Sequence, residues 1–208
     1  MKLFNYNYND TVETAYLVII LAVLFADHHK VKKNMYHYMK TIDYVNEDEI
    51  ENIRLPDRLE STRIGDCDCK TLYLLSYLYQ FDSFNNGIFL TNFKNGFYRH
   101  ILVAEWNDQV QDYLEVDMTY PERTGVYNHP GRKCLILPKA ALYQGLYDFY
   151  VDLSYEYPNE SNEGKTEIAL QFLEIVKKNP NHYFHIIDDF IHTPKYINFI
   201  PSGEHIDY

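Results

Sequence analysis

The chain has 208 residues and a formal net charge of −11, and both values limit its fold and its partners. This length suits one domain with a sizeable core, so residues 1–208 are expected to form a single unit. Phosphate binding needs clustered cations, and the sequence contains no run of lysine or arginine. Nucleic acid is therefore not an expected partner.

The cysteines and the apolar runs bear on the compartment. Cys67, Cys69 and Cys134 are odd in number, and the first two are too close together for an ordinary bridge, so no disulfide framework is predicted. A reducing, cytoplasmic setting fits best. The apolar run at residues 15–26 is shorter than the roughly 20 residues that a membrane-spanning helix needs, and the N-terminus lacks the cationic start of a secretory signal. A membrane is not an expected partner.

The first predicted elements in chain order are helices. Asp10 followed by Glu13 is typical of a helix start and predicts a helix over residues 11–28. The polar residues 46–63 predict a short helix and then a loop. Over residues 67–79, leucines recur at a spacing of three to four, which predicts a buried helix that begins with a cysteine.

Strands and then further helices follow. Runs rich in β-formers, separated by turn residues, predict three antiparallel strands, at residues 87–93, 97–106 and 112–119. Helical patterns resume at residues 139–150, 165–178 and 183–190. Helices, then strands, then helices predict an α+β fold.

Cys67 is the candidate nucleophile. A cysteine attacks as the thiolate, which the N–H groups and the dipole of a helix N-terminus stabilise. Gly65 would allow a close backbone approach just before the helix, and the peptide N–H groups of this turn are suited to holding an oxyanion. The alternative is that Cys67 is a small buried apolar residue, the commoner fate of a lone cysteine.

The two strands that follow carry a candidate base and its partner. A hairpin symmetric about Asp108 and Gln109 places His100 opposite Asp117. The same register pairs apolar residues on the other face, Ile101 with Val116 and Val103 with Leu114. A carboxylate beside a histidine fixes its tautomer and leaves the other ring nitrogen to address a thiol. The alternative is an ordinary cross-strand ion pair on a solvated face.

Zinc is the metal to consider, because Cys67 and Cys69 with His100 or Cys134 are suitable ligand types. Residues two apart on a helix point to different sides, so the first two cysteines would not converge. Structural zinc sites also prefer two to four intervening residues. We therefore predict neither a metal nor a cofactor.

The segment Gly65-Asp66-Cys67-Asp68, followed by a leucine-rich helix, resembles the Gly-Asp-Cys-Asp motif of the transglutaminase-like superfamily of cysteine peptidases, amidases and acyltransferases. A histidine in one strand and an aspartate in the next follow in the order and spacing of that family. The resemblance covers a core at about residues 60–138. The N-terminal helical part at residues 1–60 and a C-terminal helical extension at residues 139–208 lie outside it.

The resemblance implies a papain-like core, with a central antiparallel sheet and a nucleophile helix. It implies that Cys67 forms a thioacyl intermediate, that His100 shuttles the proton, and that Asp117 holds His100. The chain departs from the family at three positions near these residues: many relatives have an acid at Cys69, a proline at Met118 and an aromatic at Leu102. No Trp or Gln precedes the nucleophile to donate to an oxyanion.

Two main functions follow from this interpretation. The first is a cytoplasmic thiol hydrolase or acyltransferase that acts on amide bonds of a protein or peptide. The second is a structural component of a phage virion, such as a head–tail connector or a homo-oligomeric ring, with a retained or vestigial site, since phage head proteins also resemble this family. A third is a peptide-binding module that keeps the cleft without the chemistry.

Overall fold

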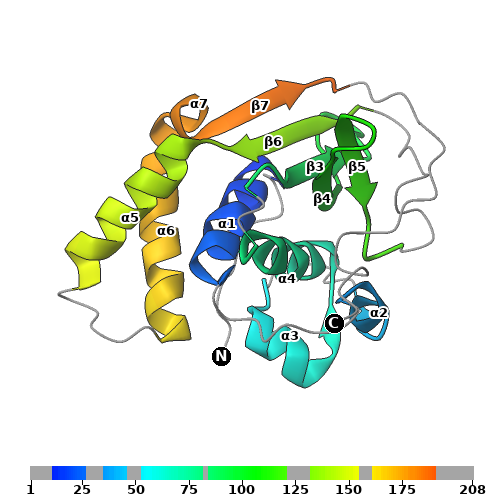
Figure 1. Ribbon diagram of the computed structural model, residues 1–208, viewed down its shortest axis with the longest axis horizontal. Coiled ribbons are helices and arrows are strands. Elements are labelled where there is room, and N and C mark those ends of the chain that lie inside the picture. The colour runs from blue at the N-terminus through cyan, green and yellow to red at the C-terminus, as the bar shows by residue number, and fades with distance from the viewer. Residues whose placement is uncertain are drawn as a thin grey trace.

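A five-stranded antiparallel sheet is the centre of the fold (Figure 1). The computed structural model describes residues 11–26, 35–45, 53–81, 84–120, 132–154 and 161–190. In these ranges the sheet has the strand order β5-β4-β3-β6-β7, and every neighbouring pair is antiparallel. Its strands are β3 (Gly87–Thr91), β4 (His100–Asn107), β5 (Asp112–Val116), β6 (Cys134–Pro138) and β7 (Phe184–Asp188). The predicted α+β class is confirmed.

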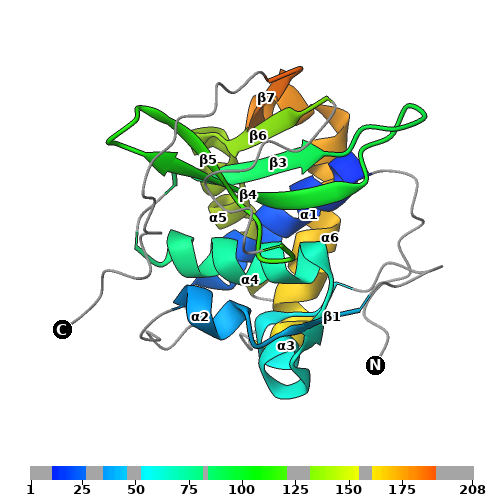
Figure 2. The ribbon, with the colours of Figure 1, turned by 90° about the vertical axis from the view of Figure 1, so that its right-hand side faces the viewer.

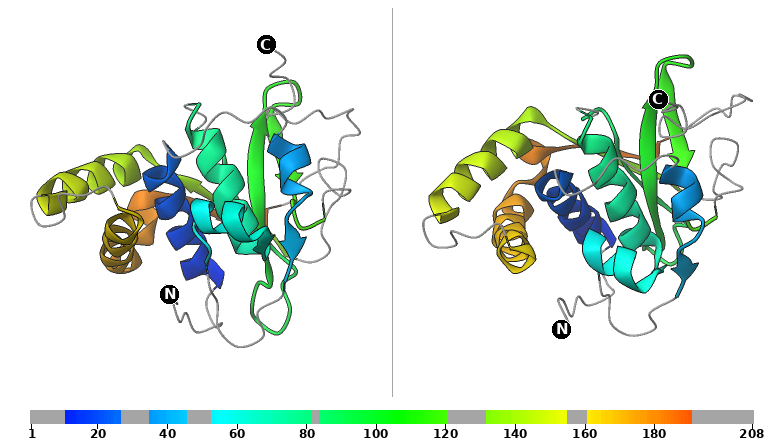
Figure 3. Two further views of the ribbon diagram at one scale, coloured as in Figure 1. Left: turned by 90° about the horizontal axis from the view of Figure 1, so that it is seen from below. Right: turned by 60° about the horizontal axis from the view of Figure 1, so that its bottom comes forward.

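Helices lie beneath one face of this sheet (Figures 1 and 2). The helices of the described ranges are α1 (Thr11–Leu24), α2 (Met35–Met39), α3 (Pro56–Thr62), α4 (Cys67–Tyr79), α5 (Ala140–Ser154), α6 (Asn162–Lys178) and α7 (Pro180–Tyr183), of which α7 lies at the end of the sheet where β7 begins. Seen from below, α6, α1 and α4 lie side by side, with α5 outermost (Figure 3). None of the helices in the described ranges is long and apolar enough to cross a membrane.

Helix α1 is the centre of the main core. It is apolar on all sides, and residues 14–22 are all buried. Such a helix is stable only when protein surrounds it, and α1 contacts α4, α6 and β3. Side chains alternate across the sheet, so Ile101 and Val103 join this core while Phe89 and Leu102 form a smaller cluster on the opposite face.

The β4–β5 hairpin has a different register from the predicted one. Val103 pairs with Val116 and Glu105 pairs with Leu114, so the predicted pairings of Ile101 with Val116 and of Val103 with Leu114 are wrong. The shift is by two residues. Because the side-chain period of a strand is two, every side chain stays on its predicted face.

The turn of this hairpin explains the shift. Asn107 pairs with Asp112, so the centre of the hairpin lies between Gln109 and Val110 instead of between Asp108 and Gln109. The Asn107 side-chain oxygen accepts the N–H groups of Gln109 and Val110, at 2.9 and 3.2 Å. Gln111 closes the loop in a left-handed conformation, with φ of 53°. An asparagine that bonds to the backbone two and three residues on stabilises a turn at this position.

The C-terminal part corrects a second prediction. The helix predicted at residues 183–190 is wrong, because α7 ends at Tyr183 and the chain continues as strand β7. Ile186 packs against the main core and Ile187 against the smaller cluster, so this segment has apolar side chains on both faces of a sheet. Strand β6, with which β7 pairs, was not predicted. The two preceding predicted helices are confirmed as α5 and α6.

The N-terminal part agrees with the predictions where the structure describes it. The predicted first helix is confirmed as α1, whereas its expected cap at Asp10 and its end at residues 27–28 lie outside the described residues. The short helix predicted within residues 46–63 is α3, but the loop predicted after it is wrong, because α3 ends at Thr62 and β2 begins at Ile64; residues 46–52 lie outside the described ranges. A parallel pair of two-residue strands, β1 (Asp43–Tyr44) and β2 (Ile64–Gly65), was not predicted.

Candidate active site

Helix α4 begins at Cys67, as predicted. Asp66 is its N-cap: the backbone there is extended, and the side chain accepts the Cys69 N–H at 3.2 Å. A Cβ atom added to Gly65 would lie 2.4 Å from Leu59 Cδ1, so the predicted close approach at this glycine is confirmed. These local contacts place Cys67 in the first turn of a buried helix.

The three cysteines differ in exposure. Cys69 and Cys134 are buried, whereas Cys67 is half-buried. Burial raises the pKa of the Cys69 thiol, whose sulfur accepts the Arg54 N–H at 3.1 Å. Burial also raises the pKa of Cys134, to about 12. Both buried side chains therefore stay in the inert thiol form near neutral pH, and Cys67 alone combines partial exposure with a helix N-terminus.

His100 and Asp117 are in contact. The His100 Nε2 atom lies 2.8 Å from the Asp117 Oδ2 atom, and both residues are buried. The other carboxylate oxygen accepts the backbone N–H groups of Thr119 and Tyr120, at 2.8 and 3.1 Å. The Tyr120 ring lies 5.9 Å from the imidazole, centre to centre. The carboxylate is thus held by the turn that follows β5, and it orients the ring.

His100 and Asp117 are in contact as predicted, but they are not a directly opposed cross-strand pair. The β4–β5 ladder ends at the pair Val103 and Val116, so His100 and Asp117 are not directly opposite. They are diagonal neighbours on one face of the sheet, within reach of long side chains. The contact survives because the register is shifted by two residues and not by one.

Side chains near the start of α4 contact the backbone next to this pair. Lys70 Nζ donates to the Met118 carbonyl oxygen at 3.3 Å, and the Thr71 hydroxyl donates to the Ile101 carbonyl oxygen at 3.2 Å. These carbonyls belong to the residues that follow the carboxylate and the imidazole in the chain. The helix that begins with Cys67 is therefore packed against the ends of β4 and β5 that carry the pair.

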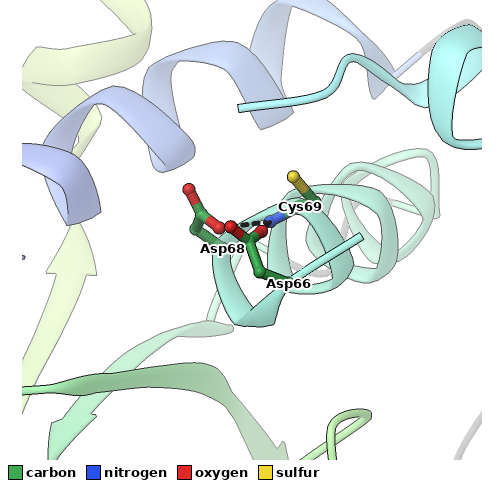
Figure 4. A group of neighbouring side chains, drawn as sticks. All are labelled: Asp66, Asp68 and Cys69. Atoms are coloured by element: carbon green, nitrogen blue, oxygen red, sulfur yellow. Dashed lines mark hydrogen bonds between the residues drawn. The ribbon is translucent and has the colours of Figure 1, made fainter. Parts of the chain in front are cut away.

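One group of possible metal ligands occurs among the described residues. The ligand atoms of Asp66, Asp68 and Cys69 lie within 4.8 Å of one another (Figure 4). Both carboxylates accept the same backbone N–H, that of Cys69, at 3.2 and 2.9 Å. These hydrogen bonds cap the N-terminus of α4 and explain why the three residues lie together. We therefore assign no metal to this group. Cys67, which was weighed as a zinc ligand, does not belong to this group.

Some polar residues around the pair were missed from the sequence. Lys70 lies three residues after Cys67, and side chains at this spacing are neighbours on a helix. This spacing could have predicted a lysine beside the cysteine. Tyr120 had no readable signal, because its position depends on the turn after β5. The buried ion pair of Lys133 with Glu115, elsewhere on the sheet, also had no readable signal, because it joins β5 to the residue before β6.

No protein-family model, curated protein or solved structure matches this chain. The function is therefore inferred from the geometry of the site and from the motif.

Proposed function

We propose that the protein is a transglutaminase-like thiol hydrolase or acyltransferase with a papain-like core, acting on amide bonds of a protein or peptide. Cys67 is the nucleophile, His100 the base and Asp117 the residue that orients the base. The observation that carries this proposal is the buried contact of 2.8 Å between His100 Nε2 and Asp117 Oδ2, beside a helix that begins with a partly exposed cysteine.

The proton transfers follow from this contact. Because Asp117 binds Nε2, Nδ1 is the ring nitrogen that takes the proton from the Cys67 thiol. The thiolate attacks the amide carbonyl carbon, the C–N bond breaks, and the imidazolium returns its proton to the leaving amine. Water or a second amine then attacks the thioacyl carbon and gives its proton to His100. The C–S bond breaks, the acid or the new amide leaves, and the imidazolium returns the proton to the Cys67 sulfur.

An oxyanion forms on the substrate carbonyl in both steps. The first N–H groups of a helix have no partner within the helix and can stabilise such an anion. The Cys69 N–H already donates to Asp66 and Asp68. We assign oxyanion stabilisation to the backbone N–H of Cys67, because it lies in the first turn of α4 and belongs to the nucleophile itself.

Reaction with iodoacetamide at pH 7 tests the nucleophile directly. We expect Cys67 to be alkylated at least about tenfold faster than Cys134, because a partly exposed thiol at a helix N-terminus forms the thiolate more readily than a buried one. Peptide mapping by mass spectrometry identifies the modified residue. Cys67→Ala should abolish the fast phase, and the matched control Cys134→Ala should keep it.

Equal alkylation rates for Cys67 and Cys134 in the folded wild-type protein would overturn the catalytic proposal. In that case the structural alternative, an assembly component with a vestigial site, would be favoured. Light scattering after size-exclusion chromatography would then be expected to show a ring or another homo-oligomer.

A further inference from the structure

Lys70 is a buried lysine that the reaction steps above do not use. Its side chain lies in the core at 4% exposure. The ammonium group donates to the carbonyl oxygens of Ile42, at 2.8 Å, and of Met118, at 3.3 Å. It therefore joins three separate segments: the residue before β1, the first turns of α4 and the residue after Asp117.

The charges around this ammonium group are mainly negative. Burial lowers the pKa of Lys70, whereas the carboxylates of Asp117, Asp43 and Asp66 favour its charged form. These carboxylates come from the end of β5, from β1 and from the N-cap of α4, and the other titratable group beside Asp117 is His100 on β4. Since so many carboxylates face it, the lysine carries the charge that balances them.

This balance matters for the thiol. Cys67 lies between Asp66 and Asp68, whose carboxylates are buried, and negative charges beside a cysteine disfavour its thiolate. The helix N-terminus offsets only part of this effect. A buried cation three residues further along the helix supplies an opposing charge.

We propose that Lys70 is a positioning residue for Cys67: it ties the first turns of α4 to the end of β5 and balances the carboxylates of Asp66 and Asp117. This inference rests on the proposed function. To the proposed roles of Cys67, His100 and Asp117 it adds a buried lysine that does not touch the substrate.

The test is the pH dependence of Cys67 alkylation by iodoacetamide in Lys70→Met. This change removes the charge and keeps the length of the side chain. We expect the midpoint of the alkylation profile to move up by about one pH unit, which makes the reaction roughly tenfold slower below the midpoint. Lys70→Arg keeps the charge and should restore most of the rate.

Lys139→Met is the matched control. Lys139 also donates to a backbone carbonyl, that of Asn181 at 2.6 Å, but it lies outside the site. Its alkylation profile should coincide with that of the wild type. Circular dichroism confirms that each variant is folded, and Lys70→Gln replaces Lys70→Met if the latter does not fold.

The outcomes separate this inference from the proposed function. Selective alkylation of Cys67 in the wild type, with an upward shift in the neutral Lys70 variant and recovery in Lys70→Arg, supports both. Selective alkylation with coinciding wild-type and neutral-variant profiles overturns the role of Lys70 alone. If Cys67 is not selectively alkylated in the wild type, the proposed function and this inference fall together.

Discussion

Two buried ion pairs lie on the five-stranded sheet, and they differ in what surrounds them. His100–Asp117 and Lys133–Glu115 have side chains that are at most 7% exposed, and each pair includes an acid at or beside β5. The Lys133 ammonium binds Glu115 and lies 5.7 Å from the centre of the Phe89 ring. The His100–Asp117 pair instead lies beside α4, the helix that begins with Cys67.

The difference teaches that burial of an ion pair does not by itself indicate catalysis. In both pairs, removing two charges from water costs free energy, and the attraction between the charges only roughly offsets this cost. What distinguishes His100–Asp117 is its contact with α4: Thr71 and Lys70 of this helix hold the backbone beside both residues. We therefore interpret one pair as part of a site and the other as part of the core.

The largest effect is expected from breaking the core pair. Lys133→Met leaves the buried Glu115 carboxylate without its ammonium partner, which should lower the free energy of unfolding by about 3–5 kcal/mol. Urea denaturation at pH 6.5 measures this loss. That pH keeps the lysine of the wild type charged, because burial lowers the pKa of Lys133 to about 8.

The control for this prediction replaces both partners. Lys133→Met combined with Glu115→Leu removes the two charges together and should recover most of the lost stability. A loss of less than about 1 kcal/mol for Lys133→Met alone would mean that the Glu115 carboxylate does not depend on Lys133 for the balance of its charge in the core. The contrast between the two regions would then be lost.

The second effect concerns reactivity. Asp117→Asn keeps the size of the side chain but removes the carboxylate that orients His100. We expect alkylation of Cys67 near neutral pH to slow by about 100-fold, measured by mass spectrometry with iodoacetamide. Glu115→Gln is the matched control, since it neutralises the acid of the other pair.

The control variant should lose stability and keep the wild-type rate of Cys67 alkylation. If both variants slow the reaction equally, the two pairs belong to one electrostatic unit. If neither variant slows the reaction, His100–Asp117 is a structural ion pair like Lys133–Glu115, which is the alternative that the sequence leaves open.

Parts of this arrangement could be predicted because their signals are local. Helix α4 was predicted at its observed bounds, since an N-cap aspartate precedes Cys67 and leucines recur at helical spacing. The common face of His100 and Asp117 was also predictable. Alternation along two strands sets that face, and a shift of two residues does not change it.

Other parts depend on contacts that no short pattern specifies. The predicted register of β4 with β5 was wrong, because the Asn107 side chain and the left-handed Gln111 select a turn centred one residue further along the chain. Strand β7 was predicted as a helix because its apolar residues gain their alternation only beside β6. The pair of Lys133 and Glu115 joins the residue before β6 to β5, a strand that is not a neighbour of β6 in the sheet, so periodicity could not predict it.

The smallest expected effect lies at Thr91, which pairs with His100 across β3 and β4. Its hydroxyl is buried and has no hydrogen-bond partner among the described residues. Thr91→Val removes this group at nearly constant volume. We expect the free energy of unfolding to rise by about 1 kcal/mol, because a buried hydroxyl without a bond is costly. Urea denaturation measures the change, and Cys67 alkylation should be unaffected.

Thr71→Val is the opposing case, because the Thr71 hydroxyl donates to the Ile101 carbonyl oxygen at 3.2 Å. Here the same substitution removes a formed bond and should lower the free energy of unfolding by about 1 kcal/mol. Opposite signs for the two variants would show that the sheet beside His100 tolerates an apolar neighbour while the contact with α4 does not. A loss of stability in Thr91→Val as well would mean that its hydroxyl is bonded. The polar network around His100 would then extend across β3 toward Lys133. The pairs His100–Asp117 and Lys133–Glu115 would in that case belong to one network.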